Sequence, residues 1–303
     1  MANLNSNYGG LALKNPFIAA ASPLTSDLAS AKQLQSGGAA AVVLPSLFEE
    51  MIEQDAKHLE QYIGKIQSYK DALDIPVLGS LNGVTESGWL ENALQLEQAG
   101  CDAIELNIYY IAADAAQSSD QIERRYIDLV YKLRAQVKIP IMVKLTSQFS
   151  SVAHLVKRLE DTGVNGVVLF NRFYLPDIDL DTLSVTPTLS LSQSQESLLR
   201  IRWIAILREQ VRLSLCATGG IHSVQDTAKA LLAGADAVQL CSVLFQQGVD
   251  ELPRLLSGLD QWIEESPFSS VTDLKGKLSY GNVSDRSGYE RQNYLQVLQA
   301  NDS

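Results

Sequence analysis

The feature that most restricts the fold of this chain is a short motif that occurs four times. In each copy a glycine ends a helical stretch and is followed by a short loop and an apolar run. The copies start at residues 38, 100, 163 and 234, which are 62, 63 and 71 residues apart. They read Gly38-Ala-Ala-Ala-Val-Val-Leu44, Gly100-Cys-Asp-Ala-Ile-Glu-Leu106, Gly163-Val-Asn-Gly-Val-Val-Leu169 and Gly234-Ala-Asp-Ala-Val-Gln-Leu240. A glycine there suits a left-handed helix cap, and each interval is about two strand–helix units.

Four more apolar runs complete the set of predicted strands, namely 17–21, 76–81, 140–145 and 213–218. Continuous apolar runs suit parallel strands that are covered on both faces. Stretches with apolar residues at three- and four-residue intervals alternate with them and predict helices. These predicted helices are 25–36, 49–72, 86–99, 120–136, 151–162, 195–211, 223–233 and 250–265.

Eight strands alternating with eight helices predict an α/β fold, the closed (β/α)8 TIM barrel. A doubly wound open sheet is the alternative, but the fourfold motif and the strand count favour closure. The 303 residues suit one such barrel, which needs about 250. We therefore predict a single domain, with the barrel in residues 1–279 and a tail in 280–303 that packs on the barrel or forms a subunit contact.

Two segments interrupt the alternation. Residues 173–194 follow the sixth strand and are rich in Asp, Thr, Ser and Pro, which predicts an ordered loop or small hairpin over the barrel mouth. The polar carboxyl-terminal tail contains one apolar-periodic stretch, Tyr289–Leu298, which predicts a short helix.

Composition excludes several classes of partner. The formal charge of −11 argues against nucleic acid or an anionic membrane surface, because both require clustered Lys and Arg. Cys101, Cys216 and Cys241 form no CxxC pair and no metal-ligand cluster, so we expect no metal and a reducing, cytoplasmic compartment. The amino terminus lacks the pattern of a secretory signal, and no apolar run approaches the roughly 20 residues of a membrane span.

The strongest local signal for a ligand is Ala217-Thr-Gly-Gly-Ile221, followed by the loop that ends in Cys241-Ser242. Adjacent glycines let the backbone approach a phosphate, and the loops after strands seven and eight are the usual phosphate site of this barrel. The alternative is two tight turns without a ligand. The pattern by itself leaves open FMN, a sugar phosphate or pyridoxal phosphate.

Polar residues end several other apolar strands and should meet at the barrel mouth. Lys144 ends strand five, and such a lysine either points into the mouth or extends out at the rim. Near a flavin it would stabilise the anionic reduced ring, and a Schiff base is a further alternative. Asn107 and Asn171 end strands four and six, and their amides suit recognition of imide groups. Ser22 ends strand one.

In this order the motifs resemble those of the class 1 dihydroorotate dehydrogenases over roughly residues 4–279. The matching segments are Asn15-Pro-Phe17 with Ala20-Ala-Ser22, Glu105-Leu-Asn107, Val143-Lys-Leu-Thr146, Ala217-Thr-Gly-Gly-Ile221 with Asp226, Gln239-Leu-Cys-Ser242 and Asp273-Leu-Lys-Gly-Lys-Leu278. The resemblance implies a cytoplasmic FMN flavoprotein of pyrimidine biosynthesis. FMN would accept hydride from dihydroorotate while a base removes the neighbouring proton. The FMN or substrate contacts would be Ser22, Asn107, Lys144, Asn171, Gly219, Gly220, Cys241 and Ser242.

The chain departs from that family in three places. The family has Asn-Leu-Ser-Cys-Pro-Asn after strand four, with the cysteine as base, whereas Asn107-Ile-Tyr-Tyr-Ile111 places Tyr110 at that position. The family's lysine on strand two is replaced within Val43-Leu-Pro-Ser46, and its substrate loop has no counterpart between residues 51 and 74. Tyr110 either covers the barrel mouth or acts as an acid that donates a proton during hydride transfer.

We therefore predict an FMN oxidoreductase that acts on CH–CH bonds of a small cyclic, pyrimidine-like substrate, with Tyr110 and Lys144 as catalytic residues. A flavin-free phosphosugar isomerase or aldolase is one alternative. A catalytically altered FMN-binding module is another. A homodimer and a separate electron-transfer partner are further expectations from the resemblance, since no iron–sulfur ligand pattern is present.

Overall fold

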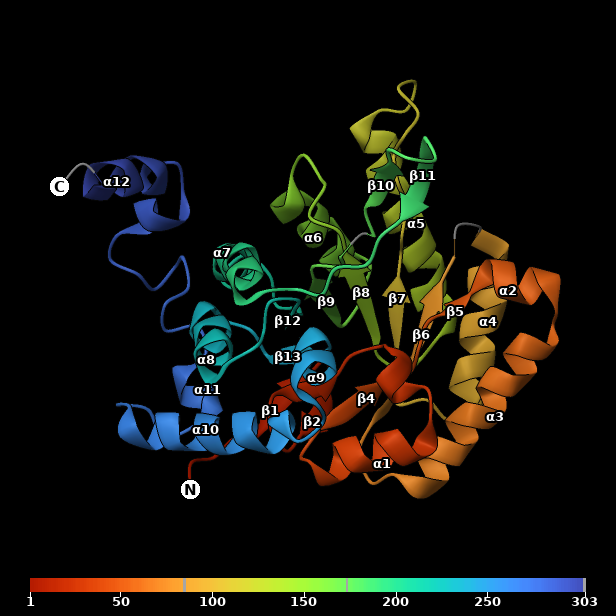
Figure 1. Ribbon diagram of the computed structural model, residues 1–303, viewed down its shortest axis with the longest axis horizontal. Helices are drawn as coiled ribbons and strands as arrows, with labels where there is room; N and C mark the ends of the chain where they lie inside the picture. Colours follow the sequence, from red (N-terminus) through yellow and green to blue (C-terminus); the bar gives the residue numbers. More distant parts are fainter. Residues whose placement is uncertain (84–85, 173, 302–303) are drawn as a thin grey trace.

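Parallel strands close into an eight-membered barrel in the computed structural model, which describes residues 1–83, 86–172 and 174–301 (Figure 1). The ring is completed where β4 pairs with β6, Val42 opposite Val77 and Val43 opposite Leu78. The predicted closed barrel is therefore confirmed over the open sheet. Its strands are β3 (Phe17–Ala19), β4 (Ala41–Val43), β6 (Val77–Asn82), β7 (Ala103–Asn107), β8 (Ile141–Leu145), β9 (Gly166–Leu169), β12 (Ser214–Thr218) and β13 (Ala237–Leu240). A short strand, β5 (Leu47–Phe48), pairs with the carboxyl end of β6.

Two layers of apolar side chains hold the barrel together. The interior is filled by buried residues that include Ile18, Val43, Met142, Val168 and Cys216. A second and larger cluster lies between the outside of the strands and the helices. Because the strands are covered on both faces, their apolar runs are continuous rather than alternating.

The helices surround the barrel, and some of them begin at a side-chain cap. The Ser118 hydroxyl accepts from the Gln121 N–H at 3.3 Å, and the Gln121 side chain accepts from the Ser118 N–H at 2.7 Å, a capping box. The helices are α1 (Leu28–Ser36), α2 (Glu49–Gln54), α3 (Lys57–Ala72), α4 (Glu86–Gln98), α5 (Ser119–Gln136), α6 (Val152–Asp161), α7 (Ser197–Leu207), α8 (Val224–Ala233), α9 (Ser242–Gln247), α10 (Glu251–Glu265), α11 (Val271–Leu274) and α12 (Gln292–Asn301). The 3₁₀ turns are η1 (Pro23–Thr25), η2 (Ser194–Glu196) and η3 (Arg286–Tyr289).

The single helix predicted over 49–72 is wrong, because the segment forms two helices, α2 and α3. The break occurs at Asp55, which has an extended backbone with φ −154° and ψ 113°. Its carboxylate accepts from the Lys57 N–H at 3.0 Å. A short polar side chain that hydrogen-bonds the nearby backbone competes with helix continuation.

A hairpin that the sequence pattern did not predict closes the amino end of the barrel. It consists of β1 (Ser6–Tyr8) and β2 (Leu11–Leu13), and it places Tyr8 in the barrel interior. The Gly9 N–H donates to Ser214 Oγ at 2.8 Å. Gly9 has φ +59°, and a Cβ there would lie 1.9 Å from Met142 Cε, so glycine is required at this turn.

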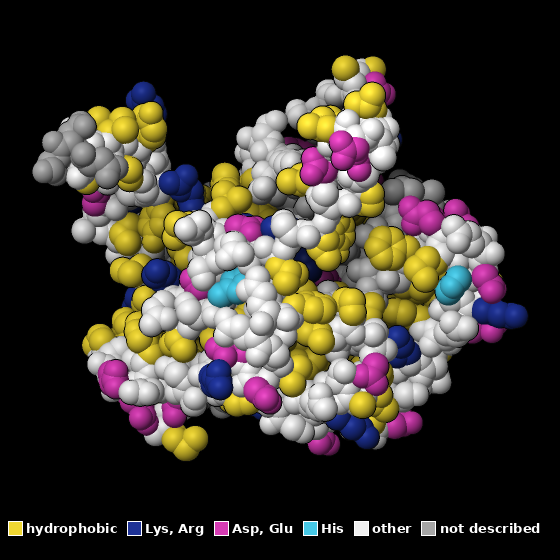
Figure 2. All heavy atoms as spheres, in the orientation of Figure 1, with side chains coloured by type: hydrophobic (Ala, Val, Ile, Leu, Met, Phe, Trp, Pro, Cys, Tyr) yellow, Lys and Arg dark blue, Asp and Glu magenta, His cyan; other side chains and the backbone are white. Residues whose placement is uncertain are grey.

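The insertion after β9 forms the predicted small hairpin. Strands β10 (Pro176–Asp179) and β11 (Ser184–Pro187) pair antiparallel and rise above the barrel (Figure 1). Apolar and acidic side chains lie together on its surface (Figure 2), and Leu180 and Leu183 are among its exposed residues. Phe173, where the predicted segment begins, lies outside the described residues.

The carboxyl-terminal region has two parts. Its first part packs on the barrel, where Lys275 Nζ lies 2.7 Å from Asp236 Oδ1 and the Tyr280 N–H donates to the Ala205 carbonyl at 3.0 Å. Its second part ends in α12, which lies apart from the barrel (Figure 1). The domain boundary at residue 279 and the role of the tail stay predictions. Among the helices of the described chain, none is both long and apolar enough to cross a bilayer.

An ion triad around a buried carboxylate at the amino end of β13 generates a first prediction. The Asp236 carboxylate accepts from the Leu215 N–H at 2.8 Å and pairs with Arg208 at 3.0 Å and Lys275 at 2.7 Å. We expect Asp236→Ala to lower the free energy of unfolding by about 3 kcal/mol, because it leaves two cations without their carboxylate. Urea denaturation measures this.

The matched control is Asp161→Asn, since Asp161 lies 3.7 Å from Lys157 in an exposed pair. Exposed pairs contribute little, so its unfolding midpoint should stay at the wild-type value. Equal midpoints for the two variants would contradict a structural role for the triad.

Candidate active site

The carboxyl ends of the strands enclose a cavity of about 220 Å³ between the barrel mouth and the insertion. Residues of β8, β12 and β13 line it, together with residues that directly follow β3 and β9 and with both ends of the insertion. Six of the predicted cofactor residues are among its lining: Lys144, Asn171, Gly219, Gly220, Cys241 and Ser242. Residues far apart in the sequence therefore meet here because parallel strands bring their carboxyl ends to one face.

Lys144 points into the barrel mouth and is buried, with 7% of its surface exposed. Its Nζ donates to Glu105 Oε1 at 3.2 Å and to Gln239 Oε1 at 3.3 Å. The Gln239 amide also donates to the other Glu105 oxygen. A buried charge requires pairing and hydrogen bonds, and this trio from β7, β8 and β13 provides both. The alternative of a lysine that extends out at the rim is excluded.

The two asparagines lie side by side at the mouth. Asn171 Nδ2 donates to Asn107 Oδ1 at 2.6 Å, and Asn107 Nδ2 donates to Ser46 Oγ at 3.3 Å. Ser46 and Ser80 hydroxyls share a hydrogen bond of 2.8 Å. These amides and hydroxyls form one continuous chain of hydrogen bonds at the mouth.

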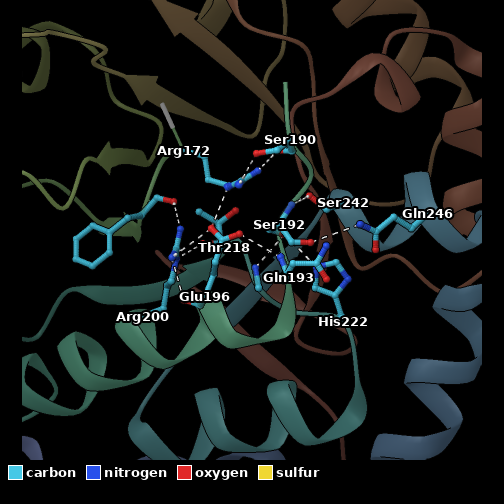
Figure 3. A network of polar contacts seen from close by, with 12 residues as sticks. Arg172, Ser190, Ser192, Gln193, Glu196, Arg200, Thr218, His222, Ser242 and Gln246 are labelled. Atoms are coloured by element: carbon cyan, nitrogen blue, oxygen red, sulfur yellow. Dashed lines mark hydrogen bonds and ion pairs between the residues drawn. The ribbon is translucent and has the colours of Figure 1, made fainter. Parts of the chain in front are cut away.

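Gly219 and Gly220 form the turn after β12, with φ values of +81° and +86°. A Cβ on Gly220 would lie 2.2 Å from the Ser197 nitrogen, so the turn requires glycine and packs tightly against the start of α7. The Gly220 N–H donates to Ser192 Oγ at 3.2 Å, and the Ser192 N–H donates to Ser242 Oγ at 3.0 Å. Ser192 from the insertion thus links the two predicted phosphate loops (Figure 3).

His222 and Asp226 border the same loops. His222 Nε2 shares a 3.0 Å hydrogen bond with Ser192 Oγ, and burial lowers the pKa of His222 below its usual value. One Asp226 oxygen accepts from the backbone N–H of His222 at 3.1 Å and from the Ser194 and Ser223 hydroxyls at 2.9 Å each. The imidazole is therefore more readily neutral than a free histidine at the same pH.

Ser22 and Cys241 lie at the ends of the neighbouring strands β3 and β13. Ser22 is 9% exposed, and its N–H donates to Thr25 Oγ1 at 3.2 Å. Burial raises the pKa of Cys241, while Lys144 and a hydrogen bond with Ser22 oppose the rise. A raised pKa disfavours the thiolate, which is the reactive form, so Cys241 fits the cavity wall rather than a nucleophile.

Tyr110 makes its contacts with the segment that follows β7 and with α5. Its hydroxyl donates to Gln117 Oε1 at 2.8 Å, and the Arg125 guanidinium lies 4.7 Å from the centre of its ring. Tyr110 is not among the described residues that line the cavity. Its catalytic role stays a prediction.

Sequence reasoning missed several groups of the site. Glu105 and Gln239 are a charge and an amide inside apolar strands, and that signal could have identified them as partners of Lys144. Arg172, Ser192 and Arg200 had no comparable signal, because they lie after β9, in the insertion and on α7, and only the packing of these segments brings them close to the predicted phosphate loops. In the described part of the chain, no group of three His, Cys, Asp or Glu side chains could hold a metal ion.

Comparison with known proteins identifies the family. A model of the family described as dihydroorotate dehydrogenase matches residues 46–263. The chain is 23% identical over 302 residues to dihydroorotate dehydrogenase B (NAD(+)), catalytic subunit, of Thermoplasma acidophilum, covering 91% of this chain and 99% of the relative. It is 25% identical over 311 residues to dihydroorotate dehydrogenase A (fumarate) of Lactobacillus delbrueckii subsp. bulgaricus, covering 92% and 100%.

The family match spans most of the chain and includes the strands that carry Asn107, Lys144 and Asn171. It confirms the predicted FMN-dependent oxidoreductase class that acts on CH–CH bonds of small molecules, and it disfavours the flavin-free isomerase or aldolase. The chain belongs to the dihydroorotate dehydrogenase family.

Proposed function

We propose that the chain oxidises dihydroorotate, or a closely similar cyclic imide, at the carboxyl end of its barrel. The observation that supports this most directly is the contact between the Asn107 and Asn171 amides, 2.6 Å apart at the mouth. Paired amides present donors and acceptors together, which matches the alternating N–H and C=O groups of a pyrimidine ring. The relatives named above are dihydroorotate dehydrogenases.

The residues of the cavity fit FMN. Lys144 supplies a cation within a buried polar trio. Gly219 and Gly220 supply a tight backbone turn, in which a Cβ on Gly220 would clash with the Ser197 backbone. Cys241, Ser22 and Ser242 would contact the remaining parts of the cofactor. When bound, FMN supplies the hydride acceptor, and the protein orients it and excludes water. A cation beside the ring favours its anionic reduced form.

Partners beyond the substrate are also proposals. The name of one relative includes the words catalytic subunit, which supports a separate electron-transfer partner for this chain. Exposed apolar side chains on the β10–β11 hairpin, such as Leu180 and Leu183, support a homodimer contact there. The cytoplasmic location stays a prediction from the cysteines.

A second candidate is a catalytically altered FMN-binding module. One specific observation favours it: the Tyr110 hydroxyl already donates to Gln117. Tyr110 occupies the place of the family's base in the sequence, so a chain without another base would keep the cofactor and lose the reaction.

A spectroscopic experiment tests the proposed function. The purified chain, reconstituted with FMN and freed of oxygen, is titrated with dihydroorotate. We expect the flavin absorbance near 450 nm (a general property of oxidised flavins) to bleach, because dihydroorotate donates hydride to the flavin. A chain that binds FMN and stays yellow would contradict the reaction and support the altered module.

Lys144→Met provides a second test of the site. We expect FMN binding to weaken by about tenfold or more, because the charge-assisted contact is lost and Glu105 is left buried without its cation. Fluorescence quenching of added FMN measures the dissociation constant. Lys138→Met is the matched control, since Lys138 is exposed in the loop that precedes the same strand. Unchanged affinity in Lys144→Met would refute cofactor contact.

Tyr110→Phe tests the predicted catalytic role of that hydroxyl. Because the hydroxyl donates to Gln117 outside the cavity lining, we expect kcat to stay within about threefold of wild type. General acid–base groups contribute about 100-fold or more, so a loss of that size with unchanged FMN affinity would establish Tyr110 as the proton-transfer residue. Anaerobic single-turnover reduction measures the rate.

A further inference from the structure

Arg200 is a buried cation beside the Gly219–Gly220 turn, and Figure 3 shows its guanidinium next to Thr218. It extends from the first turn of α7 and is only 5% exposed. Its Nη2 lies 2.9 Å from the position that a Cβ on Gly219 would occupy. Neither the sequence motifs nor the family resemblance assigned it a role.

The guanidinium is held mainly by neutral oxygens. Its Nε donates to the Thr218 carbonyl at 2.9 Å, its Nη1 to the Glu196 carbonyl at 2.9 Å, and its Nη2 to the Phe170 carbonyl at 3.5 Å. The Glu196 carboxylate lies 3.9 Å away and is already paired with Arg172 Nε at 2.9 Å.

The other charged groups near the turn are already engaged. The Asp226 carboxylate accepts from the backbone N–H of His222 and from the hydroxyls of Ser194 and Ser223. Arg172 also donates to the Ser190 carbonyl of the insertion. The positive charge of Arg200 is therefore only partly compensated by protein groups, although burial of an unpaired charge is costly.

The contact with Thr218 also fixes the direction of one backbone donor. The Thr218 carbonyl and the Gly219 N–H belong to the same planar trans peptide, so they point in opposite directions. Because the carbonyl points to Arg200, the Gly219 N–H points away from it. The hydrogen bond between Arg200 and the Thr218 carbonyl thus orients the Gly219 N–H and places a cation on the opposite side of the turn. This arrangement is suited to an anion on the side to which the N–H points.

We infer that Arg200 is the positioning residue of the phosphate subsite: it orients the Gly219 N–H and supplies the buried positive charge that favours a phosphorylated flavin over an unphosphorylated one. This rests on FMN binding in the cavity described above. Riboflavin carries the same ring system without the phosphate, so the two flavins separate a phosphate effect from a general effect on the cavity.

The experiment measures dissociation constants of FMN and riboflavin by fluorescence quenching for the full-length chain and its Arg200→Met and Arg200→Lys variants. We expect Arg200→Met to weaken the binding of FMN by about 10- to 100-fold and the binding of riboflavin by less than about threefold. The reason is that the loss of a charge-assisted interaction affects only the phosphorylated ligand. Arg200→Lys keeps the charge but not the forked geometry, so its preference for FMN should be intermediate. Arg202→Met, an exposed position on the same helix, should match wild type.

Circular dichroism identifies variants that fail to fold. If Arg200→Met fails to fold, Arg200→Lys provides the test, and a reduced preference for FMN over riboflavin in that variant supports the inference. Equal weakening of the binding of both flavins, or an unchanged ratio of their dissociation constants in the folded variants, would overturn the inference about Arg200. The proposed function would stand in that case, provided that the wild-type chain binds FMN. A wild-type chain that binds neither flavin would overturn the proposed function and this inference together.

Discussion

Closure of the parallel barrel is the constraint on which the rest of the structure depends. The pairing of β4 with β6 completes the hydrogen-bonded ring and removes the exposed edges that an open sheet would have. Because the strands are parallel, closure also brings their carboxyl ends to one face. Lys144, Asn171 and Gly219, from three different strand ends, therefore line one cavity.

Buried carboxylates pair with cations at both ends of this barrel. At the amino end, Asp236 pairs with Arg208 and Lys275 and attaches the carboxyl-terminal segment to β13. At the mouth, Glu105 pairs with Lys144 within the site. In both groups the carboxylate is buried, and the cost of removing such a charge from water is recovered only through complete hydrogen bonding. The first group attaches the carboxyl-terminal segment to the barrel, and the second holds the Lys144 ammonium at the barrel mouth.

The phosphate end of the cavity shows how the insertion modifies a common barrel site. Ser192 bonds to Gly220, Ser242 and His222, so a segment distant in sequence lies between the two loops. Arg172 joins the same segment to Glu196. The Ser192 hydroxyl thereby accepts from one backbone donor of the turn after β12, the Gly220 N–H.

The sequence by itself determined the strand and helix order, the eight-stranded closure and the grouping of Lys144, Asn107, Asn171 and the glycine turn, because apolar periodicity and the fold's geometry are local or general rules. It did not determine the break at Asp55, the orientation of Tyr110 or the approach of Ser192 and Arg200 to the phosphate loops. Those depend on competition between side-chain contacts far apart in the chain, such as Arg200 with the Thr218 carbonyl. Only the packed tertiary structure decides which of those partners meet.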